Sequence, residues 1–261
     1  MQNDGVTTYA KWQYEKGADT IKFYLDSPVV SSSADMFSGK SVLDIGCGAR
    51  GKTMFYGKMG AEHITGMDIV PEYEKEAYDL AKELGLSDKF TFVLGDAAKT
   101  DFRDESFDVI IMNDAMEHVA EPEKVLAEAY RILKKGGRLY VNFPPYNHPF
   151  GAHLSDVIGI PWVHCFFSEK ALIAAYKDLV SDKPDGDARI HFRISKDENG
   201  KEYFSYINKM TIKRFKKIKA NSPFNVIYYA EIPLRGFLTP LARLPFFKEF
   251  FVKMAVCIFE K

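Results

Sequence analysis

The chain has 261 residues, with 35 basic and 36 acidic side chains and a formal net charge of −1. This length can bury a full hydrophobic core, and the balanced charge creates no global field that would attract nucleic acid or an anionic membrane. The three cysteines lie far apart, which argues against a disulfide framework or a zinc ribbon and favours a reducing cytoplasm. The N-terminus has neither a basic flank nor an apolar run, so we expect no signal peptide, and no segment reaches the roughly 20 apolar residues of a membrane span.

Strands and helices are predicted to alternate after an N-terminal helix over about residues 9–25. The predicted strands cover residues 41–45, 64–69, 90–94, 107–112 and 138–143, and the helices between them cover residues 52–59, 72–84 and 122–133. This alternation predicts an α/β fold in which helices cover both faces of a parallel sheet.

The alternation fails after Pro144 and Pro145 and returns near residue 208. We expect residues of about 148–207 to form a lid insertion, with one helix over residues 168–179. A basic helix over residues 211–220 and strands over residues 225–232 and 254–259 then complete the core. The chain is therefore predicted to be a single domain, with a core of about 38–147 and 208–261 and an N-terminal cap of residues 1–37.

Residues 234–251, between the last two predicted strands, are rich in aromatic and basic side chains. We expect a helix that covers the edge of the sheet. Peripheral membrane contact by this segment is the weaker alternative.

The segment Gly46-Cys47-Gly48-Ala49-Arg50-Gly51-Lys52-Thr53 satisfies three ligand-binding patterns. It matches G-x-G-x-x-G of dinucleotide-binding loops and G-x-x-x-x-G-K-[ST] of the phosphate loops of nucleotide hydrolases. With Asp44 two residues before the first glycine, it also matches the D-x-G-x-G-x-x-G loop of proteins that bind S-adenosylmethionine (SAM). Glycines let the backbone lie close to a ligand because they lack Cβ.

Acidic residues further along the chain separate these alternatives. Asp68 ends the second predicted strand, about 20 residues after the loop, where a ribose is typically bound. Asp96 and Ala97 follow the third strand, where a carboxylate can reach an adenine amino group. A phosphate-loop protein would instead use an acid such as Asp114 to hold magnesium, which leaves a nucleotide hydrolase as a weaker alternative.

Five segments in this order resemble the class I SAM-dependent methyltransferases of the ubiquinone-biosynthesis type: VLDIGCG, GMDI, GDA, FDVIIMNDAMEHV and LKKGGRLYVNFP. The resemblance covers about residues 40–145 and the closing strands. It implies a seven-stranded sheet with an antiparallel last strand, SAM as cofactor and S-adenosyl-L-homocysteine as product. It also implies a cofactor site formed by Asp44, Gly46, Cys47, Gly48, Gly51, Asp68, Ile69, Asp96, Ala97 and Asn113, with Lys52 as a solvated helix residue.

Methyl transfer from a sulfonium requires a positioned nucleophile and exclusion of water, and a base helps when the acceptor is a hydroxyl. Candidate catalytic residues follow the fourth and fifth strands: His118, His153 and His164. His153 is the preferred base because Gly151 lets the chain fold over the methyl position. The segment from Asp114 to His118 also resembles an acid-x-x-Glu-His motif that some methyltransferases use, with a later histidine, to hold a divalent cation.

We favour a mechanism without metal and keep a cation site of Asp114, Glu117, His118 and His164 as the alternative. An apolar acceptor is expected to meet Tyr9, Trp12, Tyr146, His148 and Trp162. The predicted function is methylation of a small-molecule acceptor, with oxygen slightly favoured over nitrogen or carbon and with no nucleic-acid partner. A SAM-binding protein without catalysis is a further alternative.

Overall fold

The computed structural model describes residues 7–48, 51–245 and 247–261. Its main feature is a seven-stranded sheet in the order β3-β2-β1-β4-β5-β9-β8. The strands are β1 Ser41–Ile45, β2 His63–Asp68, β3 Phe90–Leu94, β4 Phe107–Asn113, β5 Leu133–Phe143, β8 Asn225–Pro233 and β9 Val252–Glu260.

The first five strands of this sheet are parallel, and the last strand of the chain, β9, runs antiparallel between β5 and β8. The α/β fold expected from the sequence is therefore confirmed, including its antiparallel last strand. The expected strands agree with the observed ones to within about two residues, except that β5 begins at Leu133 rather than Arg138.

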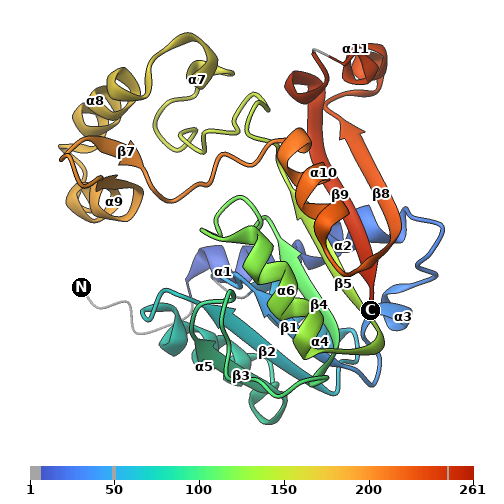
Figure 1. Ribbon diagram of the computed structural model, residues 1–261. Helices are drawn as coiled ribbons and strands as arrows, with labels where there is room; N and C mark the ends of the chain where they lie inside the picture. The colour runs from blue at the N-terminus through green and yellow to red at the C-terminus, as the bar shows by residue number, and fades with distance from the viewer. Residues whose placement is uncertain (1–6, 49–50, 246) are drawn as a thin grey trace.

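Helices cover both faces of the sheet (Figure 1). On one face, α6 Pro122–Ile132 and α10 Ile212–Asn221 pack onto the apolar side chains of β4, β5 and β9. On the other face, α2 Gly17–Leu25, α4 Gly51–Lys58 and α5 Tyr73–Glu83 cover β1 and β2, and α3 Ser33–Phe37 adds Met36 and Phe37. Burial on two faces explains why the central strands are continuous apolar runs.

The single N-terminal helix expected from the sequence is wrong, because two helices occupy this region. α1 Thr8–Glu15 ends at Lys16, and α2 begins at Gly17. A Cβ on Gly17 would lie 2.2 Å from the Phe55 ring, and one on Gly51 would lie 2.1 Å from the Ala10 carbonyl oxygen. Close contact between α1, α2 and α4 therefore requires glycine at both positions.

The region between β5 and α10 contains more regular structure than the sequence predicted. It forms α7 Val163–Phe166, α8 Glu169–Val180, α9 Gly186–Arg193 and the small hairpin of β6 Ile194–Lys196 and β7 Glu202–Phe204. These elements enclose an apolar cluster of their own that includes Leu154, Ile173 and Tyr176. In Figure 1 they lie to one side of the sheet, beyond its carboxyl edge.

The expectation of one helix between β8 and β9 is also wrong. The described residues there form two 3₁₀ turns, Gly236–Leu238 and Lys248–Phe251, and the short helix α11 Thr239–Arg243. Pro240 at the start of α11 and Pro245 after it limit the helix length. Within the described part of the chain, no helix combines the length and the apolar character needed to cross a membrane.

Candidate functional site

The loop after β1 makes a close approach to the end of β4. Gly46 has φ +72°, and its N–H donates to the Met67 carbonyl oxygen over 2.9 Å. A Cβ at Gly46 would lie 2.8 Å from the Cβ of Ala115, so a larger residue does not fit there. Gly48 also has a positive φ, of +50°. Of the predicted loop, Ala49 and Arg50 lie outside the described residues.

Asp68 connects this loop to the end of β2. One carboxylate oxygen accepts from the Gly48 N–H over 2.8 Å, and the other accepts from the Val70 N–H over 3.1 Å. Next to it, Ile69 is 70% exposed, and Leu94 at the end of β3 is 52% exposed. An exposed apolar pair at the edge of a parallel sheet, beside a carboxylate, suits a ligand with a flat apolar ring and a ribose.

The remaining predicted cofactor residues extend along the same edge of the sheet. Asp96 is exposed and accepts from the Ala98 N–H over 2.9 Å, while Ala97 is buried beneath it. Cys47 is buried, with its sulfur 3.0 Å from the position of a Cβ on Gly66. Gly51 begins α4. The fold therefore brings these predicted residues to the carboxyl ends of β1, β2 and β3.

Asp44 is buried and lies beneath the loop at the end of β1. Its carboxylate accepts from the Thr53 hydroxyl over 2.6 Å. Burial raises the pKa of Asp44 to about 7, although the Thr53 hydrogen bond and the nearby Lys52 charge act in the opposite direction. The group therefore titrates near neutral pH in the ligand-free protein.

Lys52 is not the solvated helix residue expected from the sequence. Its ammonium group lies 2.9 Å from a carboxylate oxygen of Asp114, and only 23% of its side chain is exposed. The pairing joins the start of α4 to the end of β4. Because Lys52 and Thr53 both have partners within the fold, their contacts give the nucleotide-hydrolase alternative no support.

Asn113 is buried at the end of β4 and belongs to a hydrogen-bonded network. Its carbonyl oxygen accepts from the Tyr24 hydroxyl and from the Asn142 amide, each over 2.7 Å, and its own amide donates to the Tyr56 hydroxyl over 2.6 Å. A buried network with satisfied groups holds its members in one geometry. These contacts fix the end of β4, from which Asp114 and Glu117 follow.

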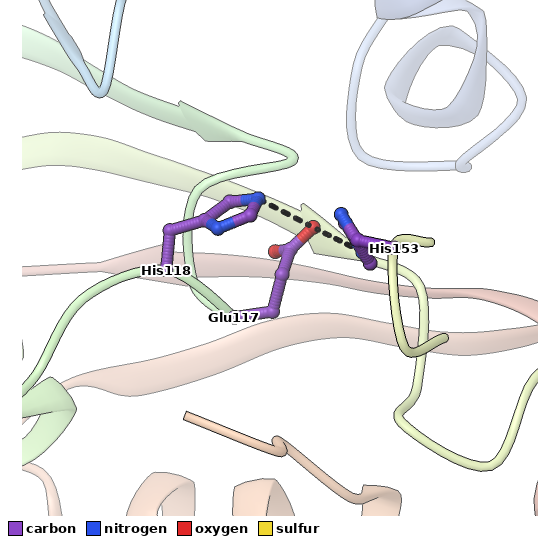
Figure 2. Close-up of side chains that lie close together, drawn as sticks. All are labelled: Glu117, His118 and His153. Carbon is purple, nitrogen blue, oxygen red and sulfur yellow. Dashed lines mark ion pairs between the residues drawn. The ribbon is translucent and has the colours of Figure 1, made fainter. Parts of the chain in front are cut away.

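Glu117, His118 and His153 come together just beyond β4 and β5 (Figure 2). One carboxylate oxygen of Glu117 lies 3.7 Å from Nε2 of His153 and 3.9 Å from Nε2 of His118. The two imidazole rings meet edge to face, with centroids 4.9 Å apart. His153 has φ +53° and Asp114 has φ +51°, values that few residues other than glycine adopt.

The surroundings favour the uncharged form of each group in this cluster. Burial raises the pKa of Glu117 well above its ordinary value, and the charge of Asp114 raises it further. Burial lowers the pKa of His118. For His153, burial and the neighbouring His118 lower the pKa to about 4. At neutral pH both imidazoles are therefore neutral and carry a lone pair.

Two lid residues and Asn208, which directly follows the lid, hold the cluster in place, and none of the three was predicted from the sequence. The Tyr206 carbonyl oxygen accepts from Nδ1 of His118 over 2.7 Å. The Asn208 amide donates to the carbonyl oxygens of Met116 and Val119 over 2.8 and 2.7 Å. Arg193 donates to the His153 carbonyl oxygen. No local sequence pattern marks these contacts, because they join residues far apart in the chain.

His164 lies apart from the cluster, contrary to its expected grouping with Glu117 and His118. It belongs to α7, and its ring faces Tyr146 at a centroid distance of 4.8 Å. Trp162 precedes α7, and its ring packs against that of Phe251 with a centroid distance of 6.3 Å. His148 has a pKa lowered to about 4 by burial and by Lys253, and it accepts from the Phe150 N–H over 3.2 Å.

The aromatic residues predicted for the acceptor are divided between two regions. Tyr9 and Trp12 stack on α1 at a centroid distance of 5.8 Å and are 59% and 51% exposed. Tyr146, His148 and Trp162 lie on the lid side, after β5. The contacts of the described residues bring no pair from the two groups together.

Comparison with known proteins connects this edge of the sheet to one family. Residues 43–141 match the family described as a methyltransferase domain. This range runs from β1 to β5 and includes the glycine loop, Asp68, Asp96 and Glu117. Over these residues the chain is similar to the class I SAM-dependent methyltransferases.

The curated relatives that match this region are named for methylation at different atoms. Over 99 residues the chain is 40% identical to the sterol 24-C-methyltransferase ERG6B of Gibberella zeae, covering 38% of this chain and 26% of that protein. Identity is 33% over 102 residues with norajmaline N-methyltransferase of Rauvolfia serpentina, covering 39% and 35%. It is 35% over 103 residues with the chloroplastic tocopherol O-methyltransferase of Arabidopsis thaliana, covering 39% and 29%. The chain thus spans about a quarter to a third of the length of these relatives.

Solved structures share the fold over most of the chain. A SAM-dependent methyltransferase from Methanosarcina mazei superposes with a TM-score of 0.55 at 21% identity, covering 90% of this chain and 97% of that one. The [4+2]-cyclase SpnF superposes with a TM-score of 0.58 at 16% identity, covering 100% and 84%. Proteins with this fold therefore include one that is named for a different reaction.

SAM is the cofactor of this family, and the residues at the sheet edge fit it. Gly46 and Gly48 have no Cβ that would obstruct a ligand next to the loop, and a Cβ on Gly46 would meet Ala115. Asp68 offers a carboxylate beside the exposed Ile69 and Leu94. When bound, SAM would supply an electrophilic methyl group, and the residues at this edge would orient it and exclude water.

Proposed function

We propose that this protein transfers a methyl group from SAM to a small-molecule acceptor, with oxygen favoured over nitrogen or carbon as the accepting atom. The observation that carries the proposal is the connection between the cofactor loop and the histidine cluster. Ala115 contacts Gly46, Asp114 binds Lys52, and Glu117 and His118 follow directly. The cofactor edge and the cluster are therefore built on one short segment.

The proposed cofactor site consists of the residues at the carboxyl ends of β1 to β4. Asp68 would bind the ribose hydroxyls, and Asp96 with Ala97 would border the adenine. Asp44, Gly46, Cys47, Gly48 and Gly51 would form the methionine end. Ile69 would pack against the adenosine, and Asn113 would hold the end of β4, since its amide oxygen already accepts two hydrogen bonds.

The preference for an oxygen acceptor rests on His153. Its neutral imidazole can accept a proton from a hydroxyl as the hydroxyl oxygen attacks the methyl carbon and the carbon–sulfur bond of SAM breaks. His118 would support it from the other side of Glu117. Its ring Nδ1 donates to the lid, which leaves a lone pair on Nε2, so His118 is a second candidate base. His164 lies in α7 against Tyr146, outside this cluster, and has no catalytic role in the proposal.

The acceptor itself is best sought with labelled SAM and a panel of phenols, hydroxy acids, sugars and amines. We expect the wild type to transfer the methyl group to a hydroxyl. In His153→Ala the rate of this transfer should fall at least about tenfold, while SAM affinity stays unchanged. His63→Ala is the matched control, because His63 starts β2 at the opposite edge of the sheet and bonds to Thr91. Tight SAM binding without turnover of any acceptor would favour the non-catalytic alternative.

A further inference from the structure

The carboxylate of Glu117 is an unusual feature of the cluster. Only 4% of its side chain is exposed, and neither of its oxygens has a hydrogen-bond partner. Leaving a carboxyl group buried without a partner costs free energy unless something else satisfies it. The Nε2 atoms of His153 and His118 lie 3.7 and 3.9 Å from one of these oxygens, which is too far for a hydrogen bond.

The tautomer of His118 is fixed by its bond to the lid. The Tyr206 carbonyl oxygen can only accept, so Nδ1 of His118 must carry the proton that it donates over 2.7 Å. In the neutral ring, Nε2 then has a free lone pair, and Figure 2 shows this nitrogen facing Glu117. Histidines that bind metal ions are commonly held in this way, with the other ring nitrogen donating to a carbonyl oxygen.

We propose that Glu117, His118 and His153 bind one divalent transition-metal ion of the Zn²⁺ type, with at least one coordination position left for an oxygen ligand. Two imidazoles and one carboxylate form the donor set of open zinc sites. Mg²⁺ and Ca²⁺ prefer oxygen donors, so they match this set less well. The three ligand atoms lie within 4.8 Å of one another, and the structure describes no other group of this kind.

The spacing of the ligands leaves room for the ion. Bonds of about 2.0–2.1 Å in a tetrahedral arrangement separate ligand atoms by about 3.4 Å. The observed separations of 3.7 and 3.9 Å from Glu117 require the side chains to close by about 0.3–0.5 Å. The two histidine nitrogens lie within 4.8 Å of each other and have to close by at most about 1.4 Å. His153 is 24% exposed on its side chain and can make this adjustment.

This set differs from the one that the sequence suggested. Asp114 is engaged by Lys52 at 2.9 Å, and His164 lies in α7 against Tyr146. Metal binding would change the role of His153, because a nitrogen that binds the ion cannot also accept a proton. An acceptor oxygen in the open position would then have a lower pKa through the charge of the ion. The catalytic consequence rests on the proposed function, but metal binding itself does not.

The test measures metal binding directly, with no acceptor present. The full chain is treated with a chelator, dialysed and titrated separately with Zn²⁺, Co²⁺ and Mg²⁺, with bound metal measured by elemental analysis. We expect one Zn²⁺ per chain and much weaker binding of Mg²⁺. Bound Co²⁺ should give the strong visible absorption of a four- or five-coordinate site. Absence of stoichiometric Zn²⁺ binding, or a preference for Mg²⁺, would overturn the proposal whether or not the protein transfers methyl groups.

Variants locate the site. Loss of a metal ligand should weaken Zn²⁺ binding by more than about 100-fold, since loss of an outer partner alone costs 10- to 100-fold. We expect this from His118→Ala and His153→Ala, whose partly exposed side chains make unfolding a small risk, and from Glu117→Gln. His164→Ala and His148→Ala are matched controls from the lid side and should bind as the wild type does. Equal affinity of the wild type, His118→Ala and His153→Ala would refute the assignment.

Discussion

Asp44 should make the stability of the ligand-free protein depend on pH. Its side chain is buried at the end of β1, and its pKa is raised to about 7. A raised carboxyl pKa stabilises the fold below the pKa of the unfolded chain, and this contribution is lost as pH rises through about 7. At about 1.4 kcal/mol for each pKa unit, the loss between about pH 5 and about pH 8 is roughly 2–3 kcal/mol.

Asp44→Asn isolates this effect because asparagine keeps an oxygen that can accept from Thr53 but cannot ionise. The assay is urea unfolding of both proteins, freed of SAM, at several values between about pH 5 and about pH 8. The free energy of unfolding of Asp44→Asn minus that of the wild type should rise by roughly 2–3 kcal/mol across this range. A difference that stays constant to within about 0.5 kcal/mol would refute the assigned pKa of Asp44.

Two further predictions concern the loop after β1 and the lid. Gly46→Ala should destabilise the fold by about 2–4 kcal/mol, because alanine is strained at a positive φ and its Cβ would collide with Ala115. Gly48→Ala has the same strain but open space around the Cβ, so it should destabilise the fold by only about 1–2 kcal/mol. Equal losses of stability for the two variants in urea unfolding would contradict the close contact between Gly46 and Ala115. Asn208→Ala removes two hydrogen bonds to the segment that carries Glu117 and should lower turnover while SAM affinity in calorimetry is kept. Asn199→Ala, in an exposed turn of the lid, is its control, and a matching loss there would show that Asn208 has no special role.

Most of the sheet could be predicted from the sequence because its signals are local. Continuous apolar runs mark β1 and β4, and glycines with Asp44 and Asp68 mark the ends of β1 and β2. The two N-terminal helices were harder to predict. The break at Lys16 depends on the packing of Gly17 against Phe55 in α4, which no local pattern reveals.

The histidine cluster was only partly predictable, for a similar reason. Glu117 and His118 are adjacent in the chain, so the motif places them together. The choice between His153 and His164 depends on the course of the lid, which is held by Arg193 and Tyr206 from a distant part of the chain. The ion pair between Lys52 and Asp114 could not be predicted from the sequence for the same reason. Lys52 and Asp114 are 62 residues apart, and only the fold brings them to 2.9 Å.

The similarity of residues 43–141 to a methyltransferase family does not by itself establish the reaction, since a [4+2]-cyclase shares the fold. The most direct measurement is calorimetry of the full chain with SAM, and separately with ATP and magnesium, for the wild type and Asp68→Ala. We expect one SAM per chain, no binding of ATP, and SAM affinity lowered at least about tenfold in Asp68→Ala by the loss of a charged hydrogen-bonding group. Binding of ATP without binding of SAM, or equal SAM affinity in both proteins, would contradict it.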